Sequence, residues 1–115
     1  MNLVPQWLQF KLSLRVVSIT PRQERASSLV VVDYSTTWCG PCKVIAPKFE
    51  ELSEQYPESI FLKVIGDSSS SASSLMKRES VRTVPAFHFF KDGVKIDVVN
   101  GANAEALEQA IKKHA

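Results

Sequence analysis

The segment LVVVDYSTTWCGPCK, residues 29–43, carries the strongest structural signal in the chain. Its first six residues form an apolar, β-branched run ending in Asp33 and Tyr34, which is typical of a central strand covered on both faces. Asp33 is therefore expected to be buried. Pro41 suits the first turn of a helix, because its φ is fixed near the helical value. The segment predicts a buried strand that passes into a helix, with two cysteines at the junction.

Cys39 and Cys42 occupy this junction. Unpaired backbone N–H groups and the helix dipole favour negative charge at a helix start. Cys39, at the exposed start, is therefore expected to be the more easily ionised thiol. Cys42 lies one turn further in, close enough to close a small disulfide ring. The pair predicts thiol–disulfide exchange, in which Cys39 attacks a target disulfide and Cys42 releases the reduced target.

The release step needs a proton acceptor, because Cys42 is predicted to be the more buried thiol. Asp33, six residues before Cys39, is placed to accept that proton if burial raises its pKa. Lys63, on a predicted neighbouring strand, either pairs with Asp33 or is an ordinary solvated lysine on a strand face. The sequence leaves both interpretations of Lys63 open.

Three further positions stand out around the cysteines. Pro41 holds the pair rigid and so influences how readily the disulfide is reduced. Trp38 is a rigid aromatic beside the nucleophile, which favours contact with protein substrates over simple packing. Pro85 precedes a predicted strand, where a proline cannot donate to the sheet, and a cis Val84–Pro85 bond would account for it.

The rest of the chain supplies alternating strand and helix signals. Alternating apolar residues predict a strand over 9–18, and residues 20–28 offer only a short, poorly anchored helix. Apolar residues at helical spacing predict a helix over 41–56 with a kink at Pro47. A further strand is expected at 60–65.

The second half of the chain predicts a short helix at 72–79 and two strands at 87–91 and 94–99. Lys91-Asp92-Gly93 is a turn signal that joins these two strands as a hairpin. Asn103 can cap a last helix that carries Leu107 and Ile111. The element order therefore indicates an α/β fold with an antiparallel hairpin at one side.

Length, charge and cysteine count limit the function. A chain of 115 residues is long enough for one compact domain, and a net charge of +2 creates no field that favours nucleic acid. Both cysteines lie in one four-residue stretch, so their use is interpreted as catalytic rather than structural. No apolar run approaches the roughly 20 residues that cross a bilayer, and Lys11 and Arg15 interrupt the first 20 residues. We expect neither membrane insertion nor secretion.

A metal site is not expected, because a lone C-x-x-C motif supplies two ligands and a structural zinc needs four. His88 inside a strand and His114 near the C-terminus are poorly placed to complete such a site, and both are interpreted as packing or surface residues. The serine-rich stretch at 68–74 favours turns and helix caps. A phosphorylatable loop is the alternative for this stretch.

In these residues the sequence resembles the thioredoxin family. The Trp-Cys-Gly-Pro-Cys-Lys motif is highly specific in this context. The resemblance runs from about Leu29 to the C-terminus, through VVVDYSTTWCGPCKVIAPKFEELS, FLKV, VRTVPAFHFFKDG and VNGANAEALEQAI. It implies the thioredoxin fold, a mixed central sheet of four to five strands flanked by helices on both faces. Residues 1–115 would form one domain, atypical over 1–28 and closely similar to the family over 29–115.

The resemblance also implies residue roles. Cys39 would be the nucleophile, Cys42 the resolving thiol and Asp33 the buried proton acceptor, while Gly40 and Pro41 modulate the redox potential. Pro85 would be the family's cis-proline. An apolar groove would bind the extended chain of a target, partly through backbone hydrogen bonds. Its residues would be Trp38, Val84, Pro85, Gly101 and Ala102.

The implied partners are disulfide-containing target proteins and a thioredoxin reductase, linked to NADPH or, in a plastid, to ferredoxin. No bound cofactor is expected. A disulfide oxidase or isomerase is the first alternative, which Pro41 and the lack of a secretory signal disfavour. A scaffold that uses the groove without either thiol is the second.

The N-terminal part departs from the family. Residues 20–28 are shorter than the family's first helix. We expect a monomer; the alternative is association, because a short helix would leave part of one sheet face uncovered. Residues 1–23 contain Lys11, Arg15 and Arg22 but no acidic residue, as in a transit peptide. Their strand-like alternation favours an integral first strand. We expect a cytoplasmic protein, with a mitochondrial or plastid location as the alternative.

Overall fold

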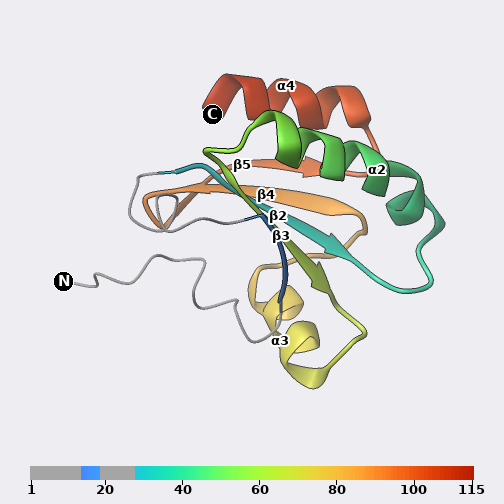
Figure 1. The fold of residues 1–115 in the computed structure, drawn as a ribbon. Helices are drawn as coiled ribbons and strands as arrows, with labels where there is room; N and C mark the ends of the chain where they lie inside the picture. The colour runs from blue at the N-terminus through green and yellow to red at the C-terminus, as the bar shows by residue number, and fades with distance from the viewer. Residues whose placement is uncertain (1–13, 19–27) are drawn as a thin grey trace.

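The computed structural model describes residues 14–18 and 28–115 of the chain. Its elements alternate between strands and helices, as Figure 1 shows. In chain order they are β1 (Leu14–Ser18), β2 (Val30–Ser35), α2 (Gly40–Gln55), β3 (Ile60–Ile65), α3 (Ser70–Arg78), β4 (Ala86–Lys91), β5 (Val94–Asn100) and α4 (Ala104–His114).

The five strands form one mixed sheet in the order β1-β3-β2-β4-β5. β2 and β3 are parallel, whereas the pairs β1–β3, β2–β4 and β4–β5 are antiparallel. Helices α2 and α4 lie over one face of the sheet and α3 lies at the other (Figure 1). The central strand β2 is therefore covered on both sides, which explains its continuous apolar run.

Two apolar clusters fill the space between the sheet and its helices. The cluster on the α3 side includes Val32, Leu62 and Leu75, and the cluster under α2 and α4 includes Val31, Phe49 and Ile111. Successive residues of a strand point to opposite faces. Asp33, two positions after Val31, therefore lies on the face that α2 and α4 cover.

Most predicted elements agree with the structure to within one or two residues. The strand at 60–65 is confirmed, and the strand expected at 29–34 is β2, one residue later. Helix α2 begins and ends one residue before its predicted bounds, and it continues through Pro47. The kink at Pro47 stays a prediction. Of the strand expected over 9–18, residues 14–18 are β1; residues 9–13, and the short helix except for Ser28, lie outside the described residues.

The predicted turns and caps have clear backbone causes. Asp92 and Gly93 both have positive φ, +53° and +78°, as a two-residue type I′ hairpin turn requires. The Asn103 side chain accepts a hydrogen bond from the Ala106 N–H at 3.0 Å and caps α4, as predicted. Ser69 caps α3 in the same way, so α3 begins at Ser70, two residues before its predicted start. This cap favours the turn-and-cap interpretation of the serine stretch.

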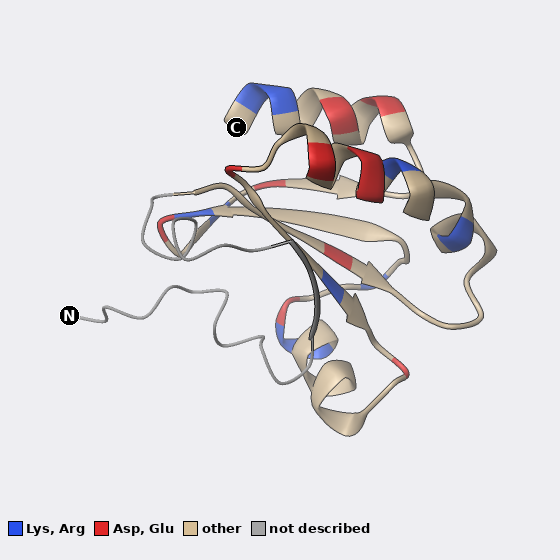
Figure 2. Ribbon diagram, viewed as in Figure 1, with Lys and Arg blue, Asp and Glu red and all other residues tan. Residues whose placement is uncertain are grey.

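The charged residues are distributed over the whole fold. Acidic and basic residues are interleaved over the elements (Figure 2), in keeping with the small net charge. None of the helices in the described ranges is both long and apolar enough to cross a membrane.

His88 is buried in β4 with its ring centroid 4.7 Å from that of Tyr34, and His114 contacts Asp97 at 2.9 Å. Both histidines are thus packing or surface residues, as predicted.

Candidate active site

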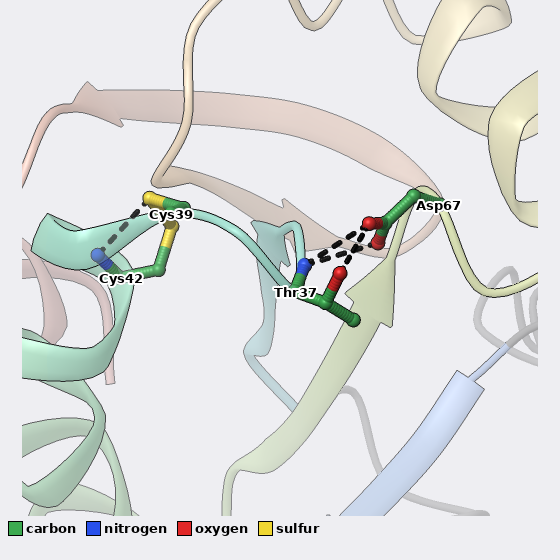
Figure 3. The surroundings of a disulfide bond; sticks show 4 residues. All are labelled: Thr37, Cys39, Cys42 and Asp67. Carbon is green, nitrogen blue, oxygen red and sulfur yellow. Dashed lines mark hydrogen bonds between the residues drawn. A yellow bond between two sulfur atoms is a disulfide. The ribbon is translucent and has the colours of Figure 1, made fainter.

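The two cysteines lie where β2 passes into α2 (Figure 3). They form a disulfide, with their Cα atoms 5.3 Å apart. Cys39 is the N-cap of α2, and its Sγ accepts a hydrogen bond from the Cys42 N–H at 3.1 Å. Pro41 stands in the first turn of the helix, where its missing N–H leaves no carbonyl without a donor. A donor at the positive end of the helix dipole thus points at the Cys39 sulfur, and would stabilise a thiolate there.

The expected exposure of the first cysteine is wrong for this disulfide form. Cys39 is 2 % exposed and Cys42 is 5 % exposed, so Cys42 is not the more enclosed residue. The physical reason is that the capping side chain of Cys39 turns back over the first helical turn, where it meets both the Cys42 N–H and the Cys42 sulfur. The residues next to the pair, Trp38, Gly40, Pro41 and Lys43, are exposed, and Trp38 is 73 % exposed.

Asp33 is the buried carboxyl group of the site, at 1 % exposure. Burial raises the pKa of Asp33 to about 7, the positive charge of Lys63 opposes this rise, and the negative charge of Glu50 on α2 adds to it. Oδ1 of Asp33 has no hydrogen-bond partner among the described residues. The predicted burial of Asp33 is confirmed, and its carboxyl group can exchange a proton near neutral pH.

Lys63 lies directly beside Asp33 in the parallel pairing of β2 and β3. The side chains of paired residues project from the same face of a sheet, and the charge of Lys63 lowers the pKa of the Asp33 carboxyl group. This placement favours the interaction of Lys63 with Asp33 over the alternative of an ordinary solvated lysine on a strand face.

The Val84–Pro85 peptide bond is cis, as predicted. The Pro85 carbonyl accepts a hydrogen bond from the Gly101 N–H at 2.8 Å, which joins the start of β4 to the end of β5. Gly101 has a φ of +91°, a conformation that favours glycine. The structure therefore brings Val84, Pro85, Gly101 and the exposed Ala102 to one place, and the predicted groove around them stays a prediction.

Two residues of this region were not predicted from the sequence, namely Thr37 and Asp67. The Thr37 N–H donates a hydrogen bond to Asp67 Oδ1 at 3.0 Å (Figure 3). Each residue follows the end of one of the two parallel strands by two positions, and the carboxyl ends of parallel strands meet at one edge of a sheet. That shared offset is the sequence signal that could have found them.

A dithiol at a helix start on this sheet, with a buried carboxyl group on the helix-covered face, defines a thiol–disulfide oxidoreductase of the α/β class. The model of the thioredoxin family matches residues 20–113. The chain belongs to the thioredoxin family. This membership confirms the fold class and the enzyme class that the sequence predicted.

Relatives support this assignment in sequence and in structure. Thioredoxin of Homo sapiens is 48 % identical over 85 residues, which are 74 % of this chain and 78 % of that protein. The X-ray structure of Fasciola hepatica thioredoxin is similar with a TM-score of 0.72 at 42 % identity, and covers 77 % of this chain and 83 % of that one. A crystal structure of a complex of ferredoxin:thioredoxin reductase and thioredoxin f2 gives a TM-score of 0.72 at 42 % identity, covering 76 % of this chain and 78 % of that one.

The described residues contain no group of three or more His, Cys, Asp or Glu side chains placed to hold a metal ion.

Proposed function

We propose that this protein reduces disulfides in target proteins through a mixed disulfide at Cys39, which Cys42 resolves. The observation that carries the proposal is the placement of Cys39 as N-cap of α2, with the Cys42 N–H donating to its sulfur. In the reduced protein this arrangement favours the Cys39 thiolate, which is the attacking species in thiol–disulfide exchange.

The exchange proceeds in two displacements. The Cys39 thiolate attacks one sulfur of the target disulfide, so that a Cys39–target bond forms and the other target sulfur leaves as a thiolate. Cys42 then loses its proton to Asp33, and its thiolate attacks the Cys39 sulfur. The Cys39–Cys42 disulfide closes and the second target sulfur leaves, so two electrons have passed to the target.

Asp33 suits the role of proton acceptor because its pKa, about 7, makes both protonation states accessible near neutral pH. Lys63 holds that pKa below the value that burial alone would give, and so modulates the resolving step. Gly40 and Pro41 modulate the redox potential from within the four-residue motif.

The target is proposed to lie along Trp38, Val84, Pro85, Gly101 and Ala102. The exposed Trp38 ring offers apolar contact area, and the backbone of Val84, just before the cis bond, can pair with an extended chain. A monomer accounts for this activity, because one chain holds both thiols and the groove residues.

The closed disulfide must be reduced again after each turnover, so a reductase is the second proposed partner. The relative in complex with ferredoxin:thioredoxin reductase supports this class of partner. An NADPH-linked reductase is the other candidate electron donor, and a cytoplasmic location is proposed with it.

Trapping the mixed disulfide tests the proposal. Cys42→Ser should accumulate a covalent adduct with a disulfide-containing protein, seen by mass spectrometry as the summed mass. Cys39→Ser should form no adduct at the active site and should lose all turnover. Retention of turnover by Cys39→Ser would contradict the proposal, and retained target binding without any turnover of the wild type would favour the scaffold.

The reduction potential of the pair separates a reductase from an oxidase. A value of about −270 mV, already known for thioredoxin, is expected at neutral pH. A value above roughly −180 mV would favour an oxidase or isomerase, since the disulfide would then be a stronger oxidant. For this two-electron couple, a difference of 30 mV corresponds to about 1.4 kcal/mol.

A further inference from the structure

Asp67 holds Thr37 through both the backbone and the side chain of that residue (Figure 3). Asp67 Oδ1 accepts a hydrogen bond from the Thr37 N–H at 3.0 Å, and Oδ2 approaches the same N–H at 3.3 Å. The Thr37 hydroxyl group also donates to Oδ2. One carboxylate thus binds two donors of a residue that lies 30 positions away in the sequence.

The pairing of β2 with β3 brings the two residues together. Ser35 and Ile65 are the last paired residues of the two strands, and the Gly66 N–H then donates to the Ser35 carbonyl at 2.8 Å. Asp67 follows immediately, at the edge where the chain leaves β2 towards the cysteines. The backbone of Asp67 is therefore placed by the central strand pair, within reach of Thr37.

The contact acts on the short loop that leads to the dithiol. Thr37 directly precedes Trp38, and Cys39 follows as the N-cap of α2. The Trp38 side chain is 73 % exposed, so burial does little to fix its direction. Within the loop the Cys39 N–H donates to the Thr36 carbonyl over a long distance, 3.4 Å. Hydrogen bonds to an ionised carboxylate are stronger than neutral ones, so the Asp67 contact is a stronger hydrogen bond than the one from Cys39 to Thr36.

We propose that Asp67 is a positioning residue of the dithiol site, which holds the loop through Thr37 so that Trp38 and Cys39 are presented correctly to a target protein. The proposal rests on the proposed function. The hydrogen bonds from Thr37 also lower the pKa of the Asp67 carboxyl group, so it is ionised at neutral pH.

The proposal predicts a selective effect on macromolecular targets. The reactivity of the Cys39 sulfur depends on the start of α2 and the Cys42 N–H, neither of which involves Asp67. A small disulfide needs only this sulfur, whereas a protein target must also fit against Trp38. Loss of the Asp67 contact should therefore slow attack on a protein disulfide and leave attack on a small disulfide nearly unchanged.

The test measures second-order rate constants of the pre-reduced protein in stopped flow, with insulin as the protein disulfide and 5,5′-dithiobis(2-nitrobenzoate) as the small one. Asp67→Ala and Thr37→Val should each slow insulin reduction, Asp67→Ala by roughly tenfold, as expected for the loss of a charge-assisted hydrogen bond. Both should change the rate with the small disulfide by less than about twofold. Thr37→Ser keeps the hydroxyl group and should restore most of the rate. Glu54→Gln, an exposed carboxylate in the last turn of α2, is the charge-matched control.

A double variant and a spectroscopic readout complete the test. Asp67→Ala combined with Thr37→Val should be no slower than Asp67→Ala alone, because the hydroxyl group acts through the carboxylate. In a Trp7→Phe background Trp38 is the sole tryptophan, and its fluorescence anisotropy should fall in Asp67→Ala. Urea unfolding shows whether Asp67→Ala has lost its fold. If it has, the insulin rate of Thr37→Val, which keeps the backbone contact to Asp67, decides whether the positioning role holds.

The outcomes separate this proposal from the proposed function. A wild type that reduces neither disulfide contradicts the proposed function, and the positioning role with it. An active wild type whose Asp67→Ala and Thr37→Val variants match it on insulin overturns the positioning role alone. Equal slowing on both disulfides also overturns it, since Asp67 would then act on the sulfur chemistry instead of target presentation.

Discussion

Asp33 of β2 lies directly beside Lys63 of β3, in the parallel pair at the centre of the sheet. Burial favours the neutral form of the Asp33 carboxyl group, and the Lys63 charge favours the ionised form. The balance leaves the pKa of Asp33 at about 7. A neighbour on the adjacent strand, together with Glu50 on α2, therefore tunes the group proposed to receive the Cys42 proton.

Replacement of Asp33 by asparagine should change how stability depends on pH. The pKa of Asp33 is about 7 in the folded protein and near 3.8 when unfolded, so its stabilising contribution is complete below about pH 4 and is lost as pH rises through 7. Asp33→Asn removes this loss, and at pH 8 it should be more stable than the wild type by on the order of 4 kcal/mol at most. Urea unfolding of the oxidised proteins between pH 5 and 9 measures the difference, with Glu54→Gln as the control. A gap that does not grow with pH would contradict the assignment.

Replacement of Lys63 by methionine should raise the pKa of Asp33 further. The change removes the positive charge that opposes the effect of burial and leaves the negative charge of Glu50 in place. The pH at which the resolving step reaches half its maximal rate should therefore shift upwards. The measurement is the rate of target release from a preformed mixed disulfide as a function of pH. Lys63→Arg keeps the charge and should keep the wild-type profile; an unshifted Lys63→Met profile would remove Lys63 from the mechanism.

The elements that were predicted best from the sequence are those specified by one simple pattern, such as a short run of apolar residues. Residues 60–65 are apolar except for Lys63, and they form β3 over the same residues. Helix α3 was harder, because serine caps and serine-rich first turns are hard to distinguish in sequence. Its start depends on which hydroxyl group reaches the Ala72 N–H, and Ser69 does so.

Some features of the site could likewise be predicted from the sequence, and others could not. The cysteine motif and the burial of Asp33 follow from local patterns, and both were predictable. The burial of Cys39 depends on a side chain that turns back onto its own helix, and the Thr37–Asp67 contact depends on the register of two strands. Neither feature is written in a contiguous stretch of sequence, so neither could be predicted from one.

His88 should make the protein sensitive to acid. Burial lowers the pKa of His88 to about 4 and the positive charge of Lys95 adds to this, whereas the unfolded value is near 6.5. The folded state therefore resists protonation, and the contribution of His88 to stability falls as pH drops from about 6.5 to about 4. His88→Leu, which keeps an apolar side chain beside Tyr34, should gain stability relative to the wild type over this range. Thermal unfolding at pH 7 and pH 4.5 measures the gain, and an equal difference at both values would count against a neutral buried histidine.

Gly66 should tolerate no side chain without movement of Met76. A Cβ atom at residue 66 would overlap the Met76 sulfur, and Met76 packs against the apolar cluster on the α3 side. Gly66→Ala should therefore destabilise the fold by roughly 1–3 kcal/mol, as overpacking does. Gly40→Ala, where a Cβ meets nothing within 4 Å, is the matched control.

Urea unfolding of Gly66→Ala, Met76→Ala and the double variant completes that comparison. If the overlap is the cause, the two changes should be less than additive by at least about 0.5 kcal/mol. Strict additivity would mean that Gly66 is required for another reason.

The hairpin turn at Asp92–Gly93 gives this protein a convenient position for engineering. Both residues are exposed, and the turn stands at the opposite end of β4 from Pro85, about 20 Å away for six extended residues. Because loop tips are where inserted segments are best accepted, a fluorescent reporter or an immobilisation tag could be built into this tip. Such a fusion would leave the thiol end of the molecule open, so the domain could serve as a surface-bound reducing reagent or as the sensing half of a redox probe.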